Sequence, residues 1–79
     1  MEIVEIDREF ITLGQLLKFE NIVESGGLVK IFLSSYEVLV NGEQEGRRGR
    51  KLYPGDVVQI EEVGVFEIKA DSNEIRADS

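Results

Sequence analysis

The stretch VLVNGEQEGRRGRKLYPGD, residues 38–56, carries the strongest structural signals in this sequence. Its first three residues, 38–40, are apolar and lead into Asn41-Gly42. This pair favours the tight turn of a β-hairpin, because both central positions of that turn need a positive φ. Residues 53–56, Tyr-Pro-Gly-Asp, predict a second turn, in which proline presets φ and glycine takes the positive-φ position. The stretch therefore predicts antiparallel strands joined by tight turns.

Two helices are predicted before this stretch. Thr12 and Gln15 have the spacing of a capping box, and leucines follow at helical spacing up to about residue 20. Ser25 is the candidate N-cap of a second helix. Because this second helix has apolar residues at 28, 29, 31, 32 and 33, we expect it to be the central, most buried helix.

The remaining pattern predicts short strands at residues 2–7, from Glu43, at 57–61 and at 65–69. The fold class is therefore α+β, with two adjacent helices packed on a small, mainly antiparallel sheet. We expect one domain over residues 1–70. Residues 71–79 are expected to form a frayed tail, because Ile75 is their one large apolar residue.

The composition restricts the classes of function. Seventy-nine residues form one small domain with little depth for a buried active site. The sequence has no histidine and no cysteine, so the commonest general base and metal ligands are missing. We therefore expect no enzymatic activity, no cofactor and no metal. The acidic N-terminus does not resemble a signal peptide and no apolar run is long enough to span a membrane, which predicts a cytoplasmic protein.

The charge distribution is uneven. The sequence has 9 basic and 16 acidic side chains and a net charge of −7, yet residues 47–51 alone hold four basic side chains. The net charge disfavours unspecific binding to nucleic acid or anionic lipid. Because charges are screened over about 8 Å in physiological salt, the local cluster can still bind a nearby phosphate. The alternative is a solvated loop that is tied to carboxylates such as Glu43 and Glu45.

Other residues could support such a site. Ser25, Gly26 and Gly27 begin the second predicted helix, where uncovered amides at the positive end of the helix dipole would bind an anion. The glycines could equally serve close packing. Tyr36 and Tyr53 are aromatic candidates for base stacking, and the alternative for both is a half-buried position.

Taken together, the two predicted helices, VLVNGE and LYPGD resemble the S4-type RNA-binding domain, the alpha-L motif, over about residues 11–60. More narrowly, ESGGLVKIFL followed by VLVNGEQEGRRGRKLYPGD is similar to small stand-alone bacterial S4-like proteins. The resemblance implies that the helix pair and the adjoining loop form an RNA-binding face. Structured RNA, such as ribosomal RNA in ribosomal particles, is the implied partner, and DNA is less favoured.

Three positions depart from the family pattern. Thr12 and Gly26 stand where the family usually has arginines, and Tyr36 stands where a glycine usually ends the second helix. A tyrosine with positive φ would be strained there. Positive charge has therefore moved toward the loop at residues 47–51. Since this loop lies outside the apolar stripes, we expect its arginines to contribute little to stability.

These observations predict a non-catalytic RNA-binding module with a role in ribosome assembly or translation. The alternative is a protein-interaction adaptor whose arginine loop binds an acidic partner. The expected RNA-binding residues are Ser25, Gly26, Gly27, Lys30, Arg47, Arg48, Arg50 and Lys51, with Lys18 and Tyr36 as accessory residues.

Overall fold

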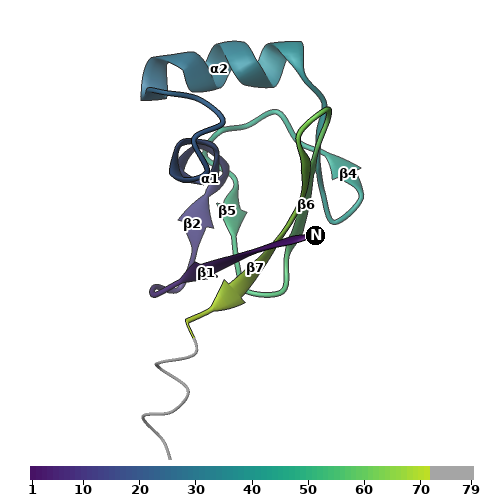
Figure 1. The fold of residues 1–79 in the computed structure, drawn as a ribbon. Helices are drawn as coiled ribbons and strands as arrows, with labels where there is room; N and C mark the ends of the chain where they lie inside the picture. Colours follow the sequence, from purple (N-terminus) through teal and green to yellow (C-terminus); the bar gives the residue numbers. More distant parts are fainter. Residues whose placement is uncertain (72–79) are drawn as a thin grey trace, which may run out of the picture.

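The structure is a computed structural model of the protein, and it describes residues 1–71 (Figure 1). The elements in chain order are β1 (Glu2–Ile6), β2 (Ile11–Thr12), α1 (Leu13–Phe19), α2 (Gly26–Ser35), β3 (Val38–Val40), β4 (Glu43–Gln44), β5 (Lys51–Leu52), β6 (Val57–Ile60) and β7 (Gly64–Ala70). The predicted α+β class is confirmed. Of the predicted tail, residues 72–79 lie outside the described residues.

Five of the strands form one sheet, in the order β1-β7-β6-β3-β4. Only β1 and β7 pair in parallel, and the other neighbours are antiparallel, as predicted. The β3–β4 hairpin turns at Asn41 and Gly42, with φ of 53° and 86°. Val40 lies opposite Glu43 across this turn. The hairpin read from the Asn-Gly pair is therefore confirmed.

Helix α1 is the buried helix. Its predicted capping box is present, because the Gln15 amide donates to the Thr12 hydroxyl and the Thr12 amide donates to the Gln15 side chain, at 3.2 and 2.8 Å. Leu13, Leu16 and Leu17 are fully buried against the sheet. Their spacing places all three on one side of the helix, which anchors α1 in the core.

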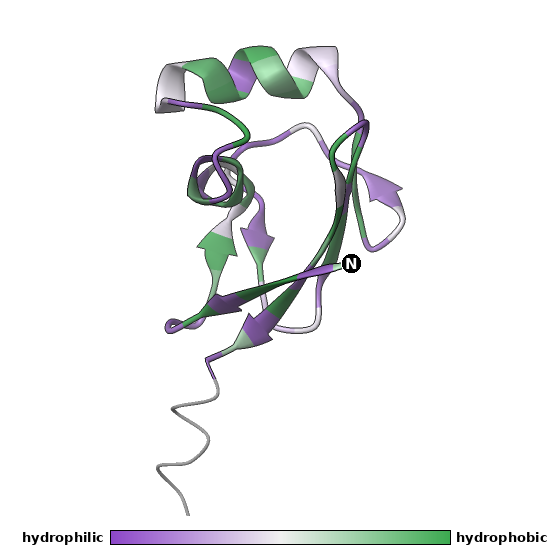
Figure 2. Ribbon diagram, in the orientation of Figure 1, coloured by the Kyte–Doolittle hydropathy of each residue, from purple (hydrophilic) through white to green (hydrophobic). Residues whose placement is uncertain are grey.

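The expectation that the second helix is the central one is wrong. Val29 is the one buried residue of α2, while Leu28 is exposed and Ile31 is 61% exposed. Figure 2 shows the apolar α2 at the outer edge of the molecule rather than between other elements. Consecutive apolar residues point in directions about 100° apart around a helix axis, so one packed side cannot bury all of them.

A second sheet of two short strands, β2 and β5, was not predicted. Ile11 pairs with Leu52 and Thr12 pairs with Lys51. Backbone hydrogen bonds continue this pairing into α1, since the Leu13 amide donates to the Arg50 carbonyl at 2.9 Å. The strand pair therefore holds the segment before β5 against the start of α1.

Gly14 permits the close approach of this segment. Its amide donates to the Arg48 carbonyl at 2.9 Å. A Cβ at Gly14 would lie 3.4 Å from the Arg48 Cβ and carbonyl oxygen, at the lower limit of ordinary van der Waals contact, so the two segments are closely packed here. The fold thus fixes the backbone of the basic loop, residues 47–51, across the first turn of α1.

Candidate nucleic-acid interface

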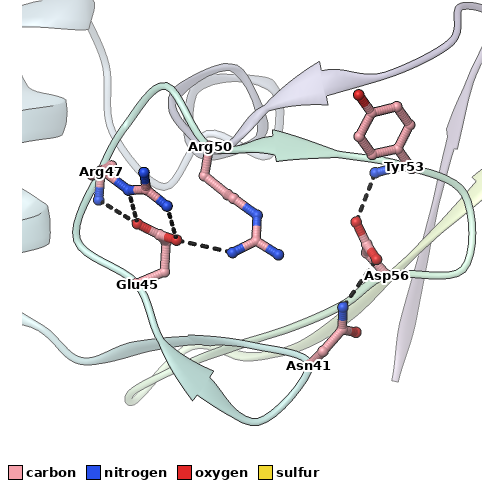
Figure 3. Close-up of polar contacts among 6 residues, drawn as sticks. All are labelled: Asn41, Glu45, Arg47, Arg50, Tyr53 and Asp56. Carbon is pink, nitrogen blue, oxygen red and sulfur yellow. Dashed lines mark hydrogen bonds and ion pairs between the residues drawn. The ribbon is translucent and has the colours of Figure 1, made fainter.

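A buried carboxylate organises the basic loop. Glu45 follows β4 and is only 7% exposed. It accepts hydrogen bonds from Arg47 Nε at 3.0 Å, Arg47 Nη2 at 3.2 Å and the Arg47 amide at 2.9 Å. Arg50 Nη1 donates to the same carboxylate at 3.0 Å (Figure 3). We call Glu45, Arg47 and Arg50 the Glu45 clamp.

The clamp is charged under all ordinary conditions. The hydrogen bond from the Arg47 side chain is the main cause that lowers the pKa of Glu45 from 4.5 to about 2, and it outweighs the burial, which acts in the opposite direction. The same bond raises the pKa of Arg47. Buried charges persist in proteins when they are paired in this way.

The clamp favours one of the two interpretations of the loop for two of its four cations. Arg47 and Arg50 are tied to Glu45, which is the carboxylate alternative that the sequence left open. Glu43, the other acidic candidate, is exposed on β4. The expectation that the loop's arginines contribute little to stability stays a prediction, and their pairing with a buried carboxylate favours a larger contribution from Arg47 and Arg50.

Arg48 points to a different place. Its side chain is exposed, and Nη1 lies 3.4 Å from the carbonyl oxygen of Gly26, at the start of α2. Lys18 Nζ lies 4.0 Å from the place that a Cβ on Gly26 would take. Two cations from α1 and from the loop thus meet at the first turn of α2. We call Lys18, Arg48 and residues 25–27 the basic cluster.

The start of α2 is open toward this cluster. Ser25 occupies the predicted N-cap position with extended backbone, but its side chain makes no capping hydrogen bond. Neither the Ser25 hydroxyl nor a side chain on Gly26 or Gly27 therefore covers the first amides of the helix. Such amides, together with adjacent cations, favour an anion.

The remaining predicted residues lie outside the basic cluster. Lys30 is exposed on α2, about one turn beyond Gly26. Lys51 is exposed on β5, and its Nζ lies 4.9 Å from the centre of the Phe10 ring. Tyr36 ends α2, so it lies about 15 Å from Ser25 along the ten-residue helix.

Tyr36 shows no backbone strain. Its φ is −125°, in the extended region, so the expected conflict with a positive φ does not arise. The helix ends without the left-handed residue that the family's glycine would supply. The Tyr36 ring stacks on Phe32 with 4.6 Å between ring centres, which gives the aromatic a packing role on α2.

Sequence reasoning missed Gly14 and Phe10 and left Glu45 as one of two acidic candidates. The Glu45 side chain stands two residues before Arg47, but neither this spacing nor its charge indicates that it is buried. Gly14 lies in the predicted first helix, where glycine carries no positional signal. Phe10 precedes β2, whose two residues are too few for a pattern.

Three other features of residues 1–71 bear on the presence of a phosphate site, a metal site or a membrane span. A hollow of about 710 Å³ lies between the end of β1 and α1. Its lining includes the cations Arg8 and Lys18, but the three carboxylates of Glu5, Asp7 and Asp71 outnumber them, which disfavours phosphate. Within these residues there is no group of three or more side chains that could hold a metal ion. Neither α1 nor α2 is long and apolar enough to cross a membrane.

Comparison with known proteins agrees with this geometry. The family model of the S4 domain matches residues 4–69, which is most of the chain. The chain therefore belongs to the S4 domain family, as the resemblance predicted. It is also 58% identical over 65 residues to the probable ribosome maturation protein RlbA of Bacillus subtilis, covering 82% of this chain and 92% of that protein.

Proposed function

We propose that this protein binds structured RNA, without catalysis, and acts in the maturation of ribosomal particles. The convergence of Lys18 and Arg48 on the open start of α2 is the observation that carries the proposal. The S4 family membership and the name of the Bacillus subtilis relative support it. Ribosomal particles would place the protein in the cytoplasm.

The binding mode follows from the charges that the clamp leaves available. Arg48 and Lys18 would each bind a phosphate near the first amides of α2. Lys51 and Lys30 would bind further phosphates along the same strand of RNA. Because the two neutralising arginines of the clamp hold the loop rigid, the cations need little ordering when RNA binds. The acidic remainder of the protein would repel phosphate elsewhere, which limits unspecific binding.

Fluorescence anisotropy with a labelled RNA hairpin tests the proposal. If Lys18, Lys30, Arg48 and Lys51 each neutralise one phosphate, the logarithm of affinity should fall with the logarithm of salt at a slope near −3, using about 0.7 per phosphate. A duplex DNA and an unstructured RNA of matched sequence serve as controls. We expect the RNA hairpin to bind best.

Two results would count against this function. No binding to any of the three nucleic acids at low salt would favour an adaptor whose loop contacts an acidic protein partner. Equal binding of DNA and RNA would remove the preference for A-form geometry and 2′-hydroxyl groups. Sedimentation of the protein with ribosomal particles in a cell-extract gradient tests the maturation role independently.

A further inference from the structure

A second feature of the loop lies beside Tyr53, outside the basic cluster. An open hollow of about 520 Å³ is lined by Arg47, Gly49, Arg50, Lys51 and Tyr53. All the charged side chains that line it are cations, although the protein as a whole is strongly acidic. Gly49 contributes no side chain, and a Cβ there would meet no atom within 4 Å. The hollow therefore offers positive charge, an aromatic ring and open space together.

The Tyr53 backbone is held in place by the turn that follows it. Its amide donates to Asp56 Oδ2 at 2.8 Å, and Asn41 Nδ2 donates to Asp56 Oδ1 at 3.0 Å (Figure 3). Gly55, with φ of 101°, allows the tight turn between them. These bonds connect Tyr53 to the β3–β4 hairpin, so the tyrosine projects from a rigid part of the fold.

The Tyr53 ring is supported but not covered. It packs against Phe10 with 5.6 Å between ring centres and 47° between ring planes, yet the residue remains 42% exposed. Lys51 Nζ lies over the same Phe10 ring. Tyr53 directly follows β5, and because Lys51 and Tyr53 both contact the Phe10 ring, their side chains lie on the same side of this segment. In Figure 3 the Arg50 side chain leaves the other side of the ribbon, toward Glu45.

We propose that this hollow binds one unpaired nucleotide of the RNA. The base stacks on Tyr53 and its phosphate contacts Lys51, while Arg47 and Arg50, paired with Glu45, form the wall of the hollow. Aromatic rings bind bases by stacking when those bases are not already stacked in a helix. The inference rests on the proposed function and sharpens it, because the preferred RNA then contains a bulge or loop beside its helical part.

The test compares two RNA hairpins that differ by one bulged nucleotide, the fluorescent base 2-aminopurine. Wild-type protein should bind the bulged hairpin more tightly and quench its fluorescence. Tyr53→Ala should lose about ten-fold or more in affinity for the bulged hairpin, since one stacked base contributes that much. The affinity of this variant for the hairpin without the bulge should stay the same as that of the wild type.

Two further variants separate stacking from structure. Tyr53→Phe keeps the ring and should retain both the quenching and the preference for the bulge. Phe19→Ala is the matched control, because Phe19 is an exposed aromatic residue, 67%, at the end of α1 and has no part in the proposed RNA contacts. It should leave binding to both hairpins unchanged. Circular dichroism and thermal melting would establish that Tyr53→Ala is folded at the assay temperature.

Two outcomes would overturn the inference while the proposed function stands. One is equal binding of both hairpins by the wild type, and the other is a Tyr53→Ala variant that keeps the bulge preference or weakens both hairpins equally. Failure of the wild type to bind either hairpin at low salt would instead overturn the proposed function itself.

Discussion

The arginines of one short loop have two different tasks. Arg47 and Arg50 bind the buried Glu45, whereas the Arg48 side chain leaves the clamp and reaches the start of α2. Their sequence positions are nearly adjacent, and their charges are identical. The difference shows that a cluster of basic residues in a sequence overstates the charge available to a ligand. In this loop Arg47 and Arg50 stabilise the conformation by binding Glu45, and Arg48 and Lys51 are the cations that are not paired with Glu45.

Removing the centre of the clamp should have the largest effect on stability. Glu45→Ala leaves Arg47 and Arg50 without their partner, and hydrogen bonds to charged groups contribute about 1.5–3 kcal/mol. We expect the free energy of unfolding to fall by about that amount, measured by urea denaturation. Glu43→Ala, which removes an exposed carboxylate from the same hairpin, should change it by less than about 0.5 kcal/mol. Equal effects of the two changes would contradict the clamp.

Reversing the charge of Arg48 should affect binding without affecting stability. Arg48→Glu removes a cation from the basic cluster, so we expect RNA affinity to fall about ten-fold or more, since 1.4 kcal/mol corresponds to ten-fold. The matched change Arg47→Gln should instead lower the melting temperature and leave the affinity of the folded protein closer to wild type. Anisotropy titrations and thermal melts of both variants test this contrast. A destabilised Arg48→Glu protein would show that the two arginines share one role.

Lowering the pH should reduce the stability that the clamp contributes, gradually and by less than the substitutions above. The pKa of Glu45 is lowered from 4.5 to about 2 in the folded protein, so this carboxylate stabilises the fold above pH 4.5. That contribution is lost as the pH falls from 4.5 through 2, because the unfolded state binds the proton first. Urea denaturation of wild type and Glu45→Gln across this range should show a smaller pH dependence for the variant. Parallel curves would mean that Glu45 does not titrate as the geometry requires.

Much of the fold could be predicted from local chemistry. The Asn41-Gly42 turn, the Thr12–Gln15 capping box and the Gly55 turn each depend on residues close together in sequence, and all three are present. The burial of α2 could not be predicted, because the sequence does not indicate which of its apolar residues pack against a neighbouring element. The β2–β5 pair was missed because two-residue strands have no periodicity.

The candidate site was predictable by residue type and not by geometry. The start of α2 and residues 47–51 were identified separately, and the structure brings Gly26 and Arg48 together. That meeting follows from the hydrogen bond between the Gly14 amide and the Arg48 carbonyl, which no local signal in the sequence indicated. Arg47 and Arg50 differ from Arg48 because Glu45 is buried beside them, and that burial depends on the path of the chain after β4.

The parallel pairing of β1 with β7 has a consequence for the timing of folding during synthesis. Glu2 lies opposite Phe66 and Ile6 lies opposite Ala70, so within residues 1–71 the first strand is paired with the last. At about 5–20 residues per second, the ribosome completes β7 several seconds after β1. During that interval the residues of both helices and of the basic loop have already been synthesised. Val4 and Ile6 of β1 still lack the neighbouring strand that covers them in the folded protein. The sheet therefore closes only after residue 70 has been synthesised.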